Sequence, residues 1–186
     1  MNTIEFGSKY AASLWDVAIV DGTKKNKHTC GAYAVNILNQ VSKYSMRRNA
    51  KSVFTPVLAR FIEDIKELEK TVKENELLIE ALYRDTAMSR EELIVLASQN
   101  NIGIWPHSYS AKYPITPSAL LFANVFSFFD SQCIAIDALI RTGWLESSKG
   151  TQLHKRLAKP IRSYMQNSVQ IYKESKSNLT VLETSQ

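Results

Sequence analysis

The apolar run between Thr116 and Gly143 constrains the fold of this 186-residue chain most strongly. Thr116 and Pro117 form a typical helix start, with threonine as N-cap and proline at the first helical position. The helix predicted after them is apolar nearly all round, so it must be buried on several sides. In a chain of this size that pattern favours the core of a dimer, for which we expect the rings of Phe122, Phe126 and Phe129.

The same stretch, residues 119–140, is long enough to suggest a membrane span. It carries Asn124, Asp130, Gln132 and Asp137, and polar side chains of this number favour a buried helix over a spanning one. The first residues lack the basic and apolar regions of a signal peptide. We therefore expect a cytoplasmic protein with no membrane partner.

The remaining pattern predicts a mainly α-helical protein with a short β-ribbon. Thr3 to Phe6 suits a short strand, and Gly31 to Ser45 a helix. Thr55 and Pro56 begin a long helix, residues 55–84, whose core positions repeat with heptad spacing: Leu58, Phe61, Ile65, Leu68, Val72, Asn75, Ile79 and Leu82. This helix is either one arm of a hairpin within the chain or an intermolecular coiled coil in which Asn75 fixes the register.

These elements divide the chain into three regions. Residues 1–101 form an N-terminal helical region that contains the long heptad helix and extends the fold as a helical hairpin. Residues 102–176 form a region for DNA binding and dimerisation. Residues 177–186 are expected to be a flexible tail.

A short extended segment, Ser108 to Pro114, precedes the apolar helix. Alternation places Tyr109, Ala111 and Tyr113 on one side of the strand. Ser108, Ser110 and Lys112 lie on the other side. A two-stranded ribbon can lie in the major groove and read base edges, and Lys112 can donate to guanine. A single strand is an unpaired edge, so this interpretation requires a twin from a second subunit. The alternative is a connector packed on the helices.

Charge is unevenly distributed along the chain. Residues 22–62 contain eight Lys and Arg and no acid, whereas residues 63–92 contain ten acids and five bases. The predicted last helix is basic again, and such asymmetry indicates a polyanionic partner. Its start, at Ser147, Ser148 and Lys149, can offer backbone N–H groups to a DNA phosphate. Lys155 and Arg156, with Lys159 and Arg162, can add electrostatic affinity.

No motif for catalysis competes with this interpretation. His28, His107 and His154 are far apart and have no acid or cysteine at ligand spacing. The sequence has no Gly-rich phosphate loop and no nucleophile elbow. We expect no enzymatic activity, no catalytic residue, no metal, no cofactor and no small-molecule ligand.

Several runs of the C-terminal half resemble the AcaB family, which is encoded on integrating conjugative elements and large transferable plasmids. They are 113–130, 140–145 and 155–162. The resemblance implies a transcriptional regulator, more often an activator, built around a ribbon-helix-helix DNA-binding unit with extended helices. Lys112-Tyr113-Pro114 is similar to the step before the first helix of such regulators, which implies base reading by Ser108, Ser110 and Lys112.

The sequence thus predicts a bacterial, sequence-specific regulator of conjugative transfer genes that binds double-stranded promoter DNA as a homodimer. The alternative is a non-enzymatic helical adaptor of a conjugative element. In that case the coiled-coil-like helix of residues 55–84 would bind the partner.

Overall fold

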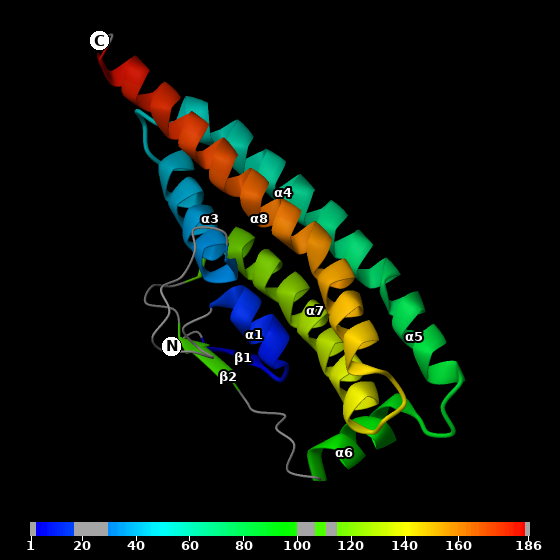
Figure 1. Cartoon of the computed structure of the whole chain (residues 1–186). Coiled ribbons are helices and arrows are strands. Elements are labelled where there is room, and N and C mark those ends of the chain that lie inside the picture. The colour runs from blue at the N-terminus through cyan, green and yellow to red at the C-terminus, as the bar shows by residue number, and fades with distance from the viewer. Residues whose placement is uncertain (1–2, 17–29, 100–106, 111–114, 185–186) are drawn as a thin grey trace.

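The computed structural model describes residues 3–16, 30–99, 107–110 and 115–184. Within these residues the protein is mainly α-helical and carries a short two-stranded antiparallel sheet, as the sequence predicts (Figure 1). The elements in chain order are β1 Thr3–Phe6, α1 Lys9–Trp15, α3 Gly31–Ser45, α4 Lys51–Glu74, α5 Glu76–Arg84, α6 Arg90–Gln99, β2 His107–Ser110, α7 Pro117–Arg141 and α8 Ser147–Thr184.

Helix α7 is the centre of the bundle. It begins with Thr116 as N-cap and Pro117 at the first position, as predicted, and it packs against α1, α3, α4, α6 and α8. By length and composition α7 is able to cross a membrane, and 61% of its most apolar window is buried inside the molecule. Gly143, with a φ of 82°, turns the chain after α7 toward α8.

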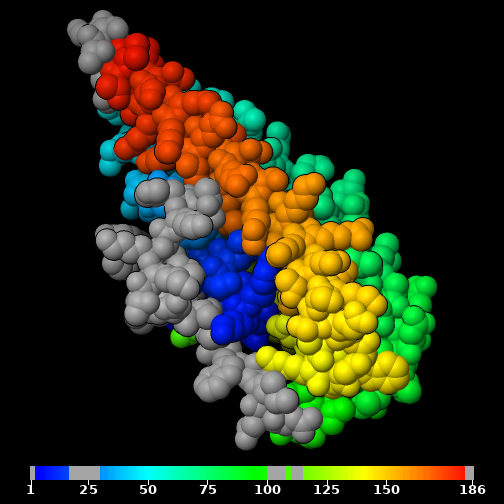
Figure 2. All heavy atoms as spheres, in the orientation of Figure 1, coloured from blue at the N-terminus to red at the C-terminus, as the bar shows by residue number. Residues whose placement is uncertain are grey.

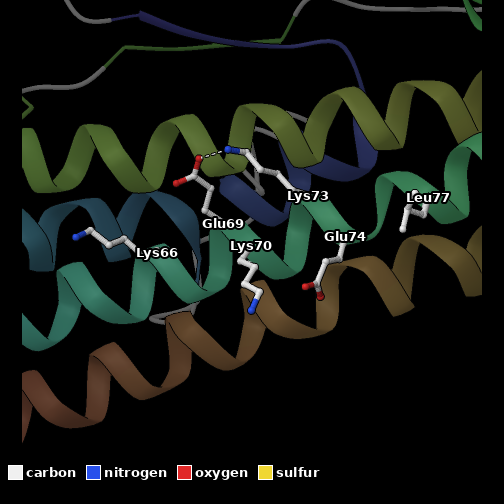
Figure 3. A pocket seen from close by; sticks show the side chains of 6 residues that line it. All are labelled: Lys66, Glu69, Lys70, Lys73, Glu74 and Leu77. Atoms are coloured by element: carbon white, nitrogen blue, oxygen red, sulfur yellow. Dashed lines mark ion pairs between the residues drawn. The ribbon is translucent and has the colours of Figure 1, made fainter.

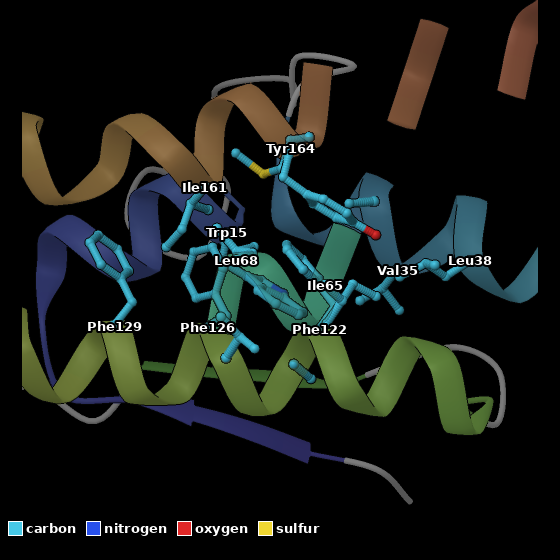
Figure 4. Close-up of a cluster of buried hydrophobic side chains, with 14 of the residues drawn as sticks. Trp15, Val35, Leu38, Ile65, Leu68, Phe122, Phe126, Phe129, Ile161 and Tyr164 are labelled. Carbon is cyan, nitrogen blue, oxygen red and sulfur yellow. The ribbon is translucent and has the colours of Figure 1, made fainter. Parts of the chain in front are cut away.

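The three rings predicted to form a dimer core are instead buried inside one chain. Phe122, Phe126 and Phe129 are each 0% exposed. Their partners come from other elements of the same chain: Phe126 meets Trp15 at a centroid distance of 4.9 Å, and Phe122 stacks on Tyr164 at 5.1 Å. Figure 4 shows these rings pointing into the space between α7, α8 and α1. Within one chain these rings have no exposed surface, so the single chain does not need a second copy to bury them, and their role in a dimer core stays a prediction.

The heptad pattern of residues 55–84 also belongs to the interior of one chain. Its members Phe61, Ile65 and Ile79 are buried where α4 and α5 pack on α3, α7 and α8. This burial decides for the arm within the chain and against the intermolecular coiled coil. The predicted helix differs in two details: α4 begins at Lys51, so Pro56 lies inside it, and Asn75 separates α4 from α5.

Helix α8 is 38 residues long and runs beside α4 along the length of the bundle (Figure 1). It begins at Ser147, as predicted. It does not end in a flexible tail at residue 177, because the helix continues to Thr184 and Leu179 is buried. Of the apolar residues near the end of α8, Leu179 is buried, whereas Val181 and Leu182 are exposed.

The two strands form one ribbon within the chain. β1 pairs antiparallel with β2, in a register that sets Thr3 opposite Ser110 and Glu5 opposite Ser108. β1 also packs on α1 and α7, which fixes the ribbon to one side of the bundle. The predicted strand at Thr3–Phe6 is confirmed with the same bounds.

Candidate nucleic-acid interface

The ribbon presents alternate residues to solvent, as the sequence predicts. Ser108 is exposed, whereas Tyr109 faces inward and meets the ring of Trp15 at a centroid distance of 5.7 Å. Ser110 lies in the same strand at the same parity as Ser108, and Lys112 lies outside the described residues. The outward face is shared with Thr3 and Glu5 of β1, so an acid lies directly opposite Ser108.

The strand that pairs with β2 comes from the same chain and not from a second subunit. β2 was expected to need a twin strand from a second subunit, yet it pairs with β1 of its own chain. The ribbon is therefore complete in a single copy. Its formation gives no reason for dimerisation.

Helix α8 carries a basic stripe, which we define as Lys155, Lys159, Arg162 and Lys173. Intervals of three, four or eleven residues bring these positions to one side of an α-helix. All four side chains are exposed, and the sequence has no acid between Ser147 and Lys173. Arg156 is exposed beside the stripe. None of the five has an ion-pair partner among the described residues.

The basic stripe faces away from the acidic side of the bundle. Arg162 donates a hydrogen bond of 3.0 Å to the hydroxyl of Tyr10, which places this side of α8 next to α1. Another side of α8 meets α4 at a groove whose charged lining residues are Asp64, Glu67 and Arg60, and Arg60 forms an ion pair with Asp64. Figure 2 shows α8 running across the visible face, with α1 in dark blue beside it. Charge that is only uneven in the sequence is thus segregated on the folded surface.

The start of α8 is a weaker phosphate site than the sequence suggests. Ser147, Ser148 and Lys149 are exposed there, as expected. However, the ammonium group of Lys149 lies 3.5 Å from the carboxylate of Glu146. Glu146 directly precedes the first residue of α8, so its carboxylate adds a negative charge near the helix N-terminus. It would repel a phosphate.

The structure does not bring the ribbon and the start of α8 together. β2 lies beside α1 on one side of the molecule, and the first turn of α8 lies near α6 at the end of α7 (Figure 1). Of the residues predicted to contact phosphate, Lys155 and Arg156 therefore belong with the basic stripe. Ser147 and Ser148 form a separate surface.

A surface hollow on α4 and α5 also contains lysines, but they are interleaved with acids, unlike the lysines of the basic stripe. It is lined by three lysines, two glutamates and Leu77 (Figure 3). Lys73 and Glu69 form an ion pair of 2.6 Å there. Lysines on this side of the molecule are interleaved with acids, unlike those of α8, so this hollow offers little attraction for a polyanion.

A buried polar cluster joins the N-terminal segment to α7 and α8, and no local pattern in the sequence indicates it. The Ser8 hydroxyl donates to Asp137 at 2.9 Å, and His154 Nε2 lies 3.4 Å from the same carboxylate. The His154 ring also stacks on the ring of Tyr10, with 4.8 Å between the two ring centroids. Ser8 and Asp137 are more than a hundred residues apart, so folding alone brings them together.

This cluster contains serine, histidine and aspartate, but their order does not suit nucleophilic catalysis. A catalytic base must contact the nucleophile, with the carboxylate behind it. Here the carboxylate of Asp137 lies between Ser8 and His154. The Ser8 oxygen also accepts from the backbone N–H of Tyr10 at 3.2 Å as the N-cap of α1. We interpret the cluster as a structural clamp.

Other titratable groups give no further site. His28 lies outside the described residues, and His107 begins β2. Within the described residues no group of three or more His, Cys, Asp or Glu can hold a metal ion. Cys30 and Cys133 are buried free thiols, and burial raises the pKa of both.

Comparison with known protein families, curated protein sequences and solved structures finds no match to this chain. The resemblance to the AcaB family and the ribbon-helix-helix assignment therefore stay predictions from the sequence.

Proposed function

We propose that this chain is a non-enzymatic, DNA-binding transcriptional regulator and that duplex DNA lies along the basic stripe of α8. The observation that carries the proposal is the row of exposed Lys and Arg side chains without ion-pair partners among the described residues. Unpaired cations on one face release counterions from DNA when they contact phosphates, and this release supplies much of the affinity.

The length of the stripe suits a duplex. Lys155 and Lys173 are eighteen residues apart, which corresponds to about 27 Å along an α-helix. Double-stranded DNA carries one charge per about 1.7 Å of its axis, so the stripe faces several phosphates at once. The groove between α4 and α8 is less favourable for DNA than the stripe, because its one arginine, Arg60, forms an ion pair with Asp64 and Glu67 adds a negative charge.

Sequence recognition is assigned to the ribbon in this proposal. Ser108 faces solvent on β2, and Ser110 and Lys112 follow at the same parity. The ribbon and the stripe are both next to α1, so one duplex bent around α1 would contact the two. Regulation of conjugative transfer genes, with activation preferred, rests on the resemblance to the AcaB family.

The homodimer and the cytoplasmic location remain part of the proposal. The contact between subunits must use surface outside the Phe122 cluster, because those rings are buried within each chain. In the adaptor alternative the helix of residues 55–84 would bind a partner. The apolar side of this segment is packed against α3, α7 and α8, so this side offers a partner no exposed apolar surface.

The test is a salt-dependent titration of promoter fragments with the Lys155→Ala/Lys159→Ala variant. Two lost phosphate contacts should lower the slope of log K against log salt by about 2. The charge-matched control is Lys66→Ala/Lys70→Ala on α4, which should leave the slope unchanged because those lysines lie among acids. Equal slopes for wild type and the α8 variant would remove the basis of the proposal.

The same titration tests the ribbon through Lys112→Ala. If the ribbon reads bases, this variant should lose the preference for promoter DNA over unrelated DNA while its salt slope falls by at most about 1. If wild-type protein binds every sequence equally and Lys112→Ala behaves like it, specific regulation is excluded, and unspecific DNA binding remains.

A further inference from the structure

A second cationic surface lies at the end of the bundle, where α3 ends, α4 begins and the last turns of α8 pass. We define the terminal cluster as Tyr44, Arg47, Tyr172 and Lys176. The guanidinium of Arg47 lies 5.0 Å from the centroid of the Tyr44 ring, and the ammonium of Lys176 lies 5.2 Å from the same centroid. Lys176 also lies 5.8 Å from the ring of Tyr172. One aromatic ring therefore gathers two cations from distant parts of the chain.

The packing of Tyr44 places these two cations near one another. Phe54 stacks on Tyr44 with a centroid distance of 4.8 Å and an interplanar angle of 25°. Phe54 thus covers part of the Tyr44 ring, and the charged groups of Arg47 and Lys176 both lie within about 5 Å of the ring centroid. Two like charges at one ring repel each other, and an anion between them would relieve this repulsion.

The chain itself supplies no such anion among the described residues. Neither Arg47 nor Lys176 has an ion-pair partner there, and Glu174 of α8 accepts a hydrogen bond from Gln170. A hydrogen bond with Tyr44 raises the pKa of Lys176, which keeps its ammonium charged. Arg48, Lys51 and Lys173 are exposed near the same chain segments. The surface is thus strongly cationic, and ion pairs within the described residues do not neutralise the charges of Arg47 and Lys176.

We propose that the terminal cluster binds a backbone phosphate of nucleic acid and is a second contact for the DNA that lies on the basic stripe. This inference rests on the proposed function and extends it. The ligand is a phosphate and not a base, because Phe54 and the two cations occupy the faces of Tyr44 on which a base would stack. Arg47 supplies a planar fork for phosphate oxygens, and Lys176 supplies a point charge held by two rings.

The distance between the two surfaces makes the inference measurable. Lys159 and Lys176 are seventeen residues apart on α8, about 26 Å along the helix. Lys173, the last residue of the stripe, is only three residues from Lys176, so a DNA hairpin with a stem of about six base pairs, which spans roughly 20 Å, contacts either the Lys155–Lys159 end of the stripe or the cluster beside Lys173, but not both. A duplex of about 20 base pairs spans roughly 68 Å and reaches both.

The experiment compares Arg47→Ala/Lys176→Ala with Lys66→Ala/Lys70→Ala on these two DNA lengths. Both variants lose two exposed cations, so they differ only in where the charge was. On the long duplex the cluster variant should lower the salt slope by about 2, and the control should not. On the short hairpin, which contacts only one end of this row of cations, the cluster variant should lower the slope by less than on the long duplex, and the control should match wild type. Thermal unfolding by circular dichroism verifies that each variant is folded.

The outcomes separate this inference from the proposed function. If Lys155→Ala/Lys159→Ala weakens binding of the long duplex and the cluster variant matches its control, the inference fails and the proposed function stands. If wild type binds neither DNA, both fail. If the cluster variant loses binding to inorganic phosphate or to anionic lipid vesicles but keeps the wild-type salt slope on DNA, the cluster serves another anion and the inference is overturned.

Discussion

At the residue scale, Asp130 connects the N-terminal segment to the central helix. Its carboxylate accepts hydrogen bonds from the backbone N–H groups of Gly7 at 2.8 Å and Ser8 at 2.9 Å. Burial nevertheless raises the pKa of Asp130 to about 6, because desolvation outweighs these two bonds and the charge of Asp137 adds to it. Protonated Asp130 is thus favoured in the folded protein over a range where the unfolded chain is ionised.

Stability should therefore fall between pH 4 and pH 6. A raised folded-state pKa contributes stability in full below the unfolded value of about 3.8, and this contribution is lost as the pH rises through about 6. The shift corresponds to a loss of about 3 kcal/mol in the free energy of unfolding. Chemical denaturation of wild type and Asp130→Asn across this range measures it. The variant should lack this component of the pH dependence.

The comparison variant is Glu63→Gln, which removes an exposed carboxyl of α4. It should keep the wild-type pH dependence between pH 4 and pH 6. A slope in Asp130→Asn as steep as in wild type would show that another group titrates there. The single oxygen of asparagine replaces two carboxylate oxygens that accept separate backbone bonds, so the variant should be less stable than wild type near pH 4; the test compares only how stability changes with pH.

At the scale of elements, Gly31 sets how closely α1 approaches α3. A Cβ atom built on Gly31 would lie 2.6 Å from Cε3 of Trp15 and 3.2 Å from its backbone Cα. The indole cannot move aside, because Trp15 is fully buried against rings that include Phe6 and Phe126. The first residue of α3 must therefore be glycine for this packing, although nothing beside it in the sequence indicates the contact.

Gly31→Ala should lower the free energy of unfolding by roughly 1–3 kcal/mol, the range typical of overpacked cores. Gly150→Ala on α8 is the matched comparison. There an added methyl would lie 2.2 Å from Cδ1 and 2.7 Å from Cγ1 of Ile140, but this side chain is partly exposed and can rotate away, and alanine improves helix propensity. It should cost less than Gly31→Ala by denaturant titration. The reverse order would contradict the packing of α1 on α3.

At the scale of the whole molecule, one chain encloses its own core within the described residues. Helix α7 contacts α1, α3, α4, α6 and α8 and needs no second copy to cover the three central rings. A capping box also forms locally before α6, because the Glu92 carboxylate accepts from the backbone N–H of Ser89 and the Ser89 hydroxyl accepts from that of Glu92. A fold of this kind differs from an intertwined dimer, whose core exists only after association.

At concentrations where sedimentation velocity shows a monomer, the unfolding midpoint should therefore not depend on protein concentration. A hundredfold dilution would destabilise an obligate dimer by up to about 2.7 kcal/mol, whereas within the monomeric range the same dilution should leave this protein unchanged, because the proposed homodimer does not supply its core. Denaturant titrations at two concentrations, with sedimentation velocity at each, measure the effect. A midpoint that falls on dilution would show that the core residues are shared between chains, as an intertwined ribbon-helix-helix dimer requires.

The sequence determined the local features of this protein. Thr116 and Pro117 specify the start of α7, alternation specifies that Ser108 faces outward and Tyr109 inward, and heptad spacing specifies the buried side of α4 and α5. These features depend on neighbours within about one turn or two strand positions, so a pattern in the chain reports them directly.

The tertiary structure decided which surfaces meet. In the structure β2 pairs with β1 of the same chain, and Phe122, Phe126 and Phe129 are buried within that chain. The Ser8 hydroxyl donates to Asp137, and Arg47 and Lys176 both lie near the ring of Tyr44. Apolar periodicity states that a face is buried and does not name its partner, since the hydrophobic effect is not directional. Contacts between segments more than a hundred residues apart follow from the packing of whole helices, which no local pattern records.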